Sequence, residues 1–193
     1  MGAWHAKGTF KWKAQRQLPP AEMFQVEASE SMEGGGQLQI KQTSGQPVRE
    51  SQYNGRTAQV REAGKDWSPA DALETARVNL WMVGRRALIS SGSEDEIKSW
   101  QVVGADAYGG RIVDLLEYKS DAGALRVAID PQSHLPMRMF FQSSDPPSPR
   151  NPTLEIEFEE YQLQDGVRLP RQIWTYVGGL LTSMDTVVSY ALE

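Results

Sequence analysis

The stretch Leu125–Tyr176 decides the fold of this chain. It opens with Leu125–Asp130 (LRVAID), continues through the turn sequence Pro131–Pro136 (PQSHLP), and closes with Arg171–Tyr176 (RQIWTY). Apolar and polar residues alternate through it with a period of two, and turn residues interrupt the alternation. This pattern is typical of antiparallel strands joined by short connections.

The same alternation continues on both sides of this stretch. Asn54-Gly55 is a strong hairpin signal, and Gly109-Gly110 predicts a second tight turn. A slip in the alternation after Phe158 predicts a bulge at Glu159–Glu160. The strands predicted before the central stretch are Trp4–Lys13, Met23–Ala28, Leu38–Ile40, Val48–Tyr53, Arg56–Glu62, Trp100–Val103 and Ile112–Tyr118.

The segment Ile112–Tyr118 differs from the other predicted strands because it is apolar on both faces. Val113 and Leu115 point one way, while Ile112 and Leu116 point the other way. A strand with two apolar faces needs cover on both sides. We therefore expect it to be a central strand of the sheet.

One helix is predicted, and Ser68 begins it. Ser68 is a suitable cap, Pro69 fits the first turn, and Asp71 suits the positive end of the helix dipole. Apolar residues then recur three or four positions apart, which predicts one apolar stripe facing the sheet. The stripe consists of Leu73, Ala76, Leu80, Val83 and Ala87.

Roughly ten strands and one helix, without alternation of strand and helix, exclude a doubly wound fold. We expect a mainly β (α+β) protein: a large curved antiparallel sheet, or half-barrel, with one main helix packed on its concave face. The 193 residues suit a single domain spanning residues 1–193.

Composition narrows the function classes. The formal net charge of −5 argues against a nucleic-acid partner, because phosphate binding requires a basic face. The absence of cysteine excludes disulfides, thiol catalysis and thiolate metal sites. No apolar run approaches the roughly 20 residues that a membrane-spanning helix needs, and no leader peptide is recognisable. Met1-Gly2 is interpreted as replacing a removed leader.

Catalytic residue patterns are weak throughout the chain. His5 and His134 are the two histidines, too few and too badly placed for a histidine zinc site. Asp130, Ser133 and His134 are neighbours in one turn, whereas a catalytic triad is assembled from distant segments. We therefore expect no enzyme, no metal and no cofactor.

An acidic ladder follows the proline-rich loop. One interpretation of Glu155, Glu157, Glu159 and Glu160 is a cation site or a pair of glycosidase carboxylates. The simpler interpretation is an exposed polar strand face whose charges discourage aggregation. We adopt the simpler interpretation.

Large apolar side chains are the remaining candidates for function. Methionine and aromatic residues adapt to irregular apolar shapes, so they either line a cavity for an acyl chain or pack as ordinary core. The ligand-binding candidates are Leu80, Trp81, Trp100, Met137, Met139, Trp174, Tyr176 and Met184.

Three segments carry a resemblance to a known family. They are Ile129–Arg138 (IDPQSHLPMR), Tyr161–Pro170 (YQLQDGVRLP) and Val103–Arg111 (VGADAYGGR). Their pattern resembles that of bacterial envelope proteins of the outer-membrane lipoprotein-sorting superfamily, which includes LolA-like and LolB-like proteins. These motifs consist of turn and strand-edge residues, so they indicate fold more than activity.

The resemblance implies a half-barrel whose concave apolar face shelters acyl chains. It further implies a non-enzymatic protein of the periplasm or cell envelope with a lipid or a lipidated protein as its partner. The alternative is an envelope interaction or scaffold domain with a filled core and no ligand.

Overall fold

The fold is a single antiparallel sheet of thirteen strands, seen in a computed structural model. The structure describes residues 9–31, 36–54, 57–71, 74–75, 78, 99–120, 123–143, 152–164 and 166–192. The strand order is β6-β5-β4-β3-β2-β1-β13-β12-β11-β10-β9-β8-β7, so the sheet is open, with β6 and β7 at its two edges.

The strands alternate with short turns along the chain. The first six are β1 (Thr9–Leu18), β2 (Glu22–Ser31), β3 (Gly36–Gln42), β4 (Pro47–Tyr53), β5 (Ala58–Glu62) and β6 (Ser68–Pro69). The remaining seven are β7 (Trp100–Tyr108), β8 (Arg111–Ser120), β9 (Gly123–Ile129), β10 (Pro136–Ser143), β11 (Leu154–Gln164), β12 (Val167–Val177) and β13 (Leu180–Leu192).

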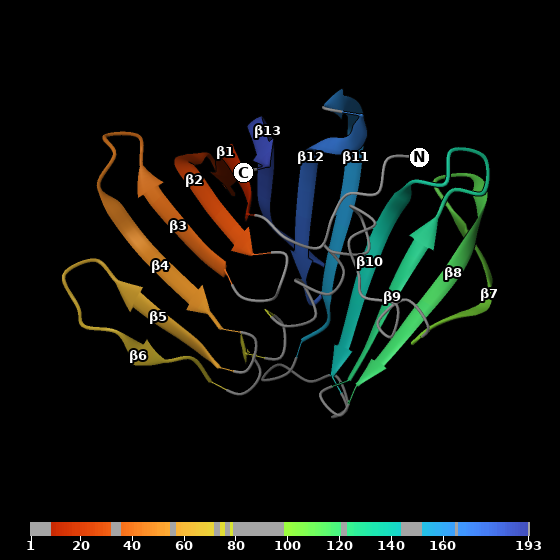
Figure 1. The fold of residues 1–193 in the computed structure, drawn as a ribbon, viewed down its shortest axis with the longest axis horizontal. Helices are drawn as coiled ribbons and strands as arrows, with labels where there is room; N and C mark the ends of the chain where they lie inside the picture. Colours follow the sequence, from red (N-terminus) through yellow and green to blue (C-terminus); the bar gives the residue numbers. More distant parts are fainter. Residues whose placement is uncertain are drawn as a thin grey trace.

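Consecutive strands are neighbours in the sheet except β6 and β7, which lie at its two edges, and one pairing joins strands that are distant in sequence. β1 pairs with β13, from Phe10 opposite Leu192 to Gln17 opposite Met184. Figure 1 shows the sheet curving from β6 on one side, past β13 and β12, to β7 on the other side. The predicted large curved antiparallel sheet is therefore confirmed.

Two predicted hairpin turns are also confirmed. Gly109 and Gly110 have φ angles of 56° and 75°, and they connect Tyr108 directly to its cross-strand partner Arg111. Positive φ at both central residues gives a turn whose twist matches that of the strands. At Asn54-Gly55 the predicted hairpin joins β4 to β5, and Asn54 N donates to Thr57 O at 3.2 Å, while Gly55 itself lies outside the described residues.

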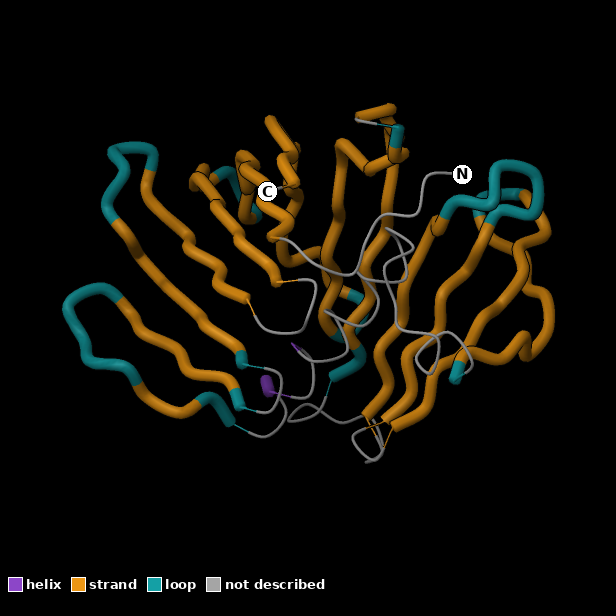
Figure 2. The backbone as a smooth tube through the Cα atoms, in the orientation of Figure 1, coloured by secondary structure: helices purple, strands orange, loops and turns teal. Residues whose placement is uncertain are grey.

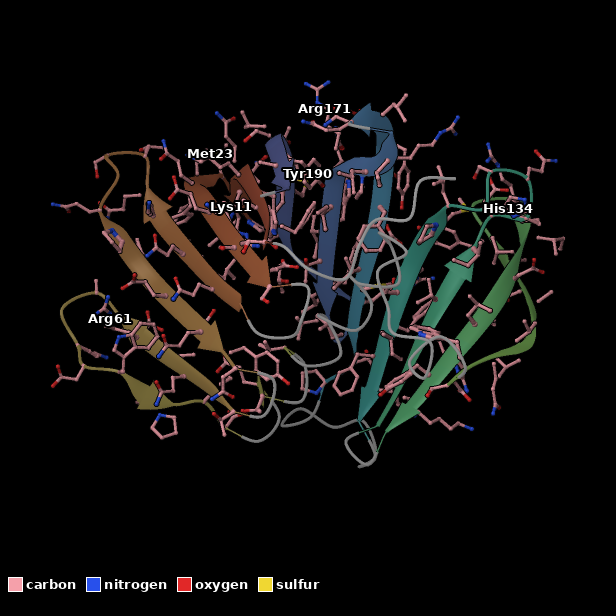
Figure 3. All side chains as sticks on the ribbon, viewed as in Figure 1. Lys11, Met23, Arg61, His134, Arg171 and Tyr190 are labelled. Carbon is pink, nitrogen blue, oxygen red and sulfur yellow. The ribbon has the colours of Figure 1, made fainter. Side chains whose placement is uncertain are left out.

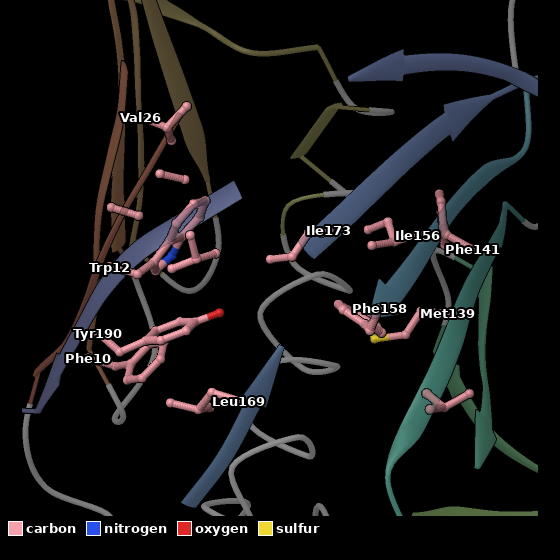
Figure 4. Packing of buried hydrophobic residues seen from close by; sticks show 14 of the residues in the cluster. Phe10, Trp12, Val26, Met139, Phe141, Ile156, Phe158, Leu169, Ile173 and Tyr190 are labelled. Atoms are coloured by element: carbon pink, nitrogen blue, oxygen red, sulfur yellow. The ribbon is translucent and has the colours of Figure 1, made fainter. Parts of the chain in front are cut away.

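The hydrophobic core lies on the concave face of the sheet. Figure 4 shows Trp12 and Tyr190 on one side of the core and Phe158 and Met139 on the other side, with Ile173 between them. The buried members of the cluster come from strands on both halves of the sheet. They are Phe10, Trp12, Ala14, Val26, Ala28, Leu125, Val127, Met139, Phe141, Ile156, Phe158, Leu169, Ile173, Val187 and Tyr190.

The predicted main helix on the concave face is not confirmed. Helical backbone is described only at Glu74, Thr75 and Val78, and Figure 2 shows it as short pieces. All five residues of the predicted apolar stripe lie outside the described residues.

The predicted start of the helix is wrong. Ser68–Pro69 forms β6, because Ser68 pairs with Val60 at the edge of the sheet, where proline is tolerated. Helical backbone is described from Glu74, whose backbone N–H donates to Asp71 Oδ1 at 2.7 Å.

The expectation of a central position for Ile112–Tyr118 is also wrong. This segment belongs to β8, which is next to the edge strand β7. Val113 is fully buried, whereas Ile112 on the opposite face is 65% exposed. Apolar side chains on both faces therefore did not require a central strand.

The predicted bulge at Glu159–Glu160 is replaced by a residue in the left-handed region. Glu160 has a φ of 52°. The register of β11 against β12 is the same on both sides of it, so no extra residue is inserted. After this residue Leu163 is 71% exposed, which explains why the alternation appeared to slip.

Replacing Phe10 with alanine should lower the free energy of unfolding by about 3–5 kcal/mol. Phe10 is 1% exposed, and its ring stacks on Tyr190 with the centroids 5.4 Å apart. Urea denaturation of the wild type and F10A measures the loss. Val188→Ala, at a position that is 66% exposed, should change stability little; equal losses in both variants would contradict the described core.

Candidate functional site

The apolar concave face contains a pocket at its centre. The pocket has a volume of about 190 Å³ and lies between β1, β3, β11 and β12. Most of its wall is apolar, and the aliphatic side chains come from strands far apart in sequence. The lining residues are Trp12, Arg16, Leu38, Val78, Leu154, Ile156, Ile173, Thr175 and Asp185.

An ion pair forms the polar part of this pocket. Arg16 on β1 and Asp185 on β13 are cross-strand partners. Arg16 Nε donates to Asp185 Oδ1 at 2.7 Å, and Arg16 Nη2 donates to Asp185 Oδ2 at 2.6 Å. The Asp185 side chain is 3% exposed. A carboxylate this deeply buried is stable only when paired, and the bidentate geometry provides that pairing.

A smaller pocket of about 80 Å³ lies next to it, between β2–β5 and the turn containing Glu74 and Val78. Tyr53, Ala58 and Val60 contribute to its wall. Glu30 is buried beside it and accepts a hydrogen bond from Trp12 Nε1 at 3.0 Å. The concave face is thus apolar, with its buried carboxylates hydrogen-bonded to neighbouring side chains.

Two of the predicted ligand-binding residues belong to this face. Met139 is 2% exposed within the core cluster, and Trp100 packs against that cluster from β7. Met137 is half-buried where the pairing of β9 with β10 shifts register between Pro136 and Arg138. Met139 does not line the described pockets, so it contributes to the packed wall around them.

Three other predicted residues point to the outer, convex face. Trp174 and Tyr176 alternate along β12 with Ile173 and Thr175, which face the concave side. Met184 pairs with Trp174 and alternates with Asp185. Leu80 and Trp81 lie outside the described residues. The structure therefore does not bring the predicted set together in one place.

The acidic ladder is more buried than expected. Arg138 donates through Nη2 to Glu155 and lies 3.7 Å from Glu157 through Nε. Its guanidinium also stacks over Phe140 at 4.3 Å and Tyr108 at 5.1 Å, each measured to the ring centroid. The interpretation as an exposed polar face is wrong for Glu155 and Glu157, which are half-buried, and holds for Glu159 and Glu160.

This arrangement affects two tyrosines on the outer face. Tyr176 Oη donates to Glu157 Oε2 at 3.2 Å. Burial raises the pKa of Tyr176, and the nearby negative charge of Glu157 raises it further. Burial and the hydrogen bond to Glu157 likewise raise the pKa of Tyr108. Both phenols therefore stay neutral under ordinary conditions and serve as hydrogen-bond donors.

The turn containing His134 is a structural turn. His134 has a φ of 56°, and its N–H donates to Asp130 O at 2.8 Å. Figure 3 labels it at the rim of the molecule. Asp130 Oδ1 accepts the Gln132 N–H, which lowers the pKa of Asp130. Among the described residues, no group of three or more His, Asp or Glu is placed to hold a metal.

Sequence reasoning missed the Arg16–Asp185 pair. The two residues are 169 positions apart, and nothing local marks either of them as buried. One signal was available: Arg16 shares the face of Phe10, Trp12 and Ala14, so strand periodicity alone places a charge inside.

Arg16→Ala should destabilise the fold by about 3–5 kcal/mol, because it leaves Asp185 buried without its partner. The double variant R16M/D185L should recover most of that loss, since it removes both charges. Chemical denaturation measures both differences. Equal losses in the single and double variants would mean that packing, rather than charge pairing, dominates at this position.

The free energy of unfolding should fall in acid. Lys119 and Arg126 hydrogen-bond to Glu117 and lower its pKa, and Lys41 does the same for Glu27. A lowered folded-state pKa stabilises the fold fully above the unfolded value of 4.5, and this stabilisation disappears as the pH falls through the folded value. Urea denaturation from pH 7 to about pH 3 should show this fall. In Glu117→Gln the fall should be shallower; an unchanged acid dependence would contradict the assignment.

Comparison of the sequence with protein-family models finds no match, and a search of curated proteins finds none either. Among the described residues, none forms a helix long and apolar enough to cross a membrane.

Solved structures do match. A domain assigned to outer membrane lipoprotein sorting, from Vibrio parahaemolyticus, aligns over 96% of this chain and 86% of its own, with 9% identity and a TM-score of 0.61. A LolA superfamily protein from Nitrosomonas europaea aligns over 97% and 86%, with 10% identity and a TM-score of 0.61. A DUF1329 family protein from Desulfovibrio piger aligns over 97% and 85%, with 8% identity and a TM-score of 0.58.

These matches cover nearly the whole chain at low sequence identity, so they establish the arrangement of strands and nothing finer. They agree with the resemblance found in Ile129–Arg138 and Tyr161–Pro170. The chain has the fold shared by these three structures, one of which is a LolA superfamily protein.

Proposed function

We propose that this chain is a non-enzymatic protein of the bacterial periplasm or cell envelope that binds an apolar or lipid ligand on the concave face of its sheet. The observation that carries the proposal is the pocket formed by Leu38, Leu154, Ile156 and Ile173, which continues the apolar core. Acyl chains of lipidated proteins are one form such a ligand takes.

Burial of apolar surface supplies the driving force. Each Å² of apolar surface removed from water contributes about 25 cal/mol. The wall combines β-branched, aromatic and aliphatic side chains from both halves of the sheet, so it offers a continuous apolar contact rather than isolated side chains. This favours a flexible hydrocarbon over a rigid polar ligand.

The Arg16–Asp185 pair sets the chemistry at one side of the pocket. Its charges neutralise each other through two hydrogen bonds, so it offers neither a strong anion site nor a cation site. An uncharged acyl chain therefore suits the pocket better than a ligand whose charge would need its own partner.

The envelope location rests on structural likeness. Two matching structures carry lipoprotein-sorting or LolA superfamily descriptions. Fold and activity are separable, so the likeness supports the ligand class only together with the apolar pocket of this chain.

A second candidate function is an interaction or scaffold domain with a filled interior. The sizes of the concave-face pockets favour it: about 190 Å³ and about 80 Å³ both lie below the range of about 300–1,000 Å³ typical of ligand sites. Under this alternative the large side chains of the core serve stability alone, and the surface carries the function.

Binding of a fluorescent fatty-acid analogue, dansyl-undecanoic acid, to delipidated protein distinguishes the two functions. We expect saturable binding by the wild type. Thr175→Trp introduces a large side chain at the pocket wall, and it should raise the Kd at least about tenfold.

The matched control is Thr186→Trp. Thr186 lies on β13, is exposed, and faces away from the pocket that Asp185 lines. T186W should bind like the wild type. If the wild type does not bind the analogue, or if both tryptophan variants lose binding equally, the lipid proposal is rejected and the filled-core alternative is favoured.

A further inference from the structure

A broad groove crosses strands β2–β5 apart from the larger concave-face pocket, and it borders the smaller one, with which it shares Gly36, Gln37, Gln52 and Tyr53. It has a volume of about 680 Å³. Its described lining residues include side-chain amides, hydroxyls and one phenol, and none of them is charged. They are Thr9, Ser29, Ser31, Gly36, Gln37, Gln52, Tyr53, Asn54, Thr57 and Gln59.

A row of hydrogen-bonding side chains forms the floor of this groove. Ser29 pairs with Gln37, Gln37 pairs with Gln52, and Gln52 pairs with Gln59 across β2, β3, β4 and β5. These residues alternate with Ala28 and Leu38, which face the core, so the row lies on the outer face. Since strands are about 4.8 Å apart, the row is about 14 Å long.

Lys11 lies opposite Ser29 and continues this row onto β1, whereas the charges of the next row are paired with one another. In the adjacent row Glu27 contacts Lys13 at 3.4 Å, and it also contacts Lys41 from the row beyond at 2.5 Å. Glu50 accepts hydrogen bonds from Gln39 at 2.6 Å and from Arg61 Nε at 2.7 Å. These ion pairs neutralise one another, and the described lining residues of the groove carry no charge.

The amides of the row are oriented by their own contacts. Gln52 Nε2 donates to Gln59 Oε1 at 2.7 Å. This bond fixes which end of each amide faces the groove, leaving Gln52 Oε1 as an acceptor and Gln59 Nε2 as a donor. Beside them, Asn54 Oδ1 accepts the N–H of Thr57 at 2.9 Å, which holds the rim of the groove in place.

The chemistry of this surface selects one class of ligand. A charged ligand would lose hydration without meeting an opposite charge. An apolar ligand would leave the amides without hydrogen-bond partners, which is costly. Hydroxyl groups both donate and accept, as amides do, so a polyhydroxylated neutral ligand satisfies the row best.

We propose that this groove binds a short neutral oligosaccharide, held by hydrogen bonds from the amide row of Gln37, Gln52 and Gln59. Tyr53 is 7% exposed, so it does not offer an open aromatic platform, and hydrogen bonding carries the recognition. None of the groove's described lining residues lines the concave-face pocket that contains Arg16 and Asp185, and the proposal goes beyond the proposed lipid function.

The test is titration of the whole chain with neutral tetrasaccharides (chitotetraose, cellotetraose and maltotetraose) and with the charged tetragalacturonate, by calorimetry. At least one neutral tetrasaccharide should bind with a Kd below about 1 mM, and tetragalacturonate should bind at least about tenfold more weakly. Q37A/Q52A should raise the Kd for the neutral ligand at least about tenfold.

The control is Q15A/Q25A. Gln15 and Gln25 are also a cross-strand pair of exposed glutamines on the outer face, but they do not line the groove. The control should bind like the wild type. In the wild type, side-chain amide NMR signals of Gln37, Gln52 and Gln59 should shift on binding, which tests the site even if a variant misfolds.

Three outcomes overturn the proposal: no neutral tetrasaccharide binds at millimolar concentration, tetragalacturonate binds equally well, or the two double variants lose binding equally. Lipid binding gives an independent readout. Q37A/Q52A should still bind dansyl-undecanoic acid like the wild type, and T175W should still bind the saccharide.

Discussion

The pairing of β1 with β13 is the interaction on which the rest of the structure depends. β1 bonds β2 on one side and β13 on the other, so it joins the half made of β2–β6 to the half made of β7–β13. Side chains reinforce this seam: Phe10 stacks on Tyr190, and Arg16 pairs with Asp185. Every pocket wall that combines the two halves exists because this pairing forms.

The curvature of the sheet separates two kinds of surface. On the inside, residues at alternate positions form an apolar wall that is almost entirely withdrawn from water. On the outside, the same strands carry charges in pairs, such as Glu50 with Arg61 and Glu117 with Arg126. Because successive side chains of a strand point to opposite faces, one alternating pattern produces both surfaces. A charged residue at an inner-face position, such as Arg16, is an exception to that pattern.

Local pattern was sufficient to predict the sheet. The two turn motifs illustrate why: Asp130 organises the β9–β10 turn through its own backbone neighbours, and Tyr161 Oη donates to Pro136 O at 2.5 Å, which links the two motif segments. These residues are needed for the geometry of the fold, so they identified the fold. They do not line the described pockets, so they carried little information about a site.

The candidate site was less predictable because its residues come together only through long-range pairing. Which face of the sheet Trp174, Tyr176 and Met184 occupy depends on how β12 pairs with β13. Selecting residues for their large side chains gives no information about that pairing. The predicted start of the helix was wrong because Ser68 and Pro69 have a high propensity for the first turn of a helix. In the structure they pair with β5 at the edge of the sheet instead.

The order of the strands has a consequence for biosynthesis. Among these strands the ribosome synthesises β1 first and β13 last. β1 therefore cannot pair with β13 until all the other strands have been synthesised. Pairing over such sequence distances is slow, and until it occurs β1 and β12 each present an unpaired edge to other chains. A newly made chain of this kind is most exposed to aggregation just before the thirteen residues of β13 emerge.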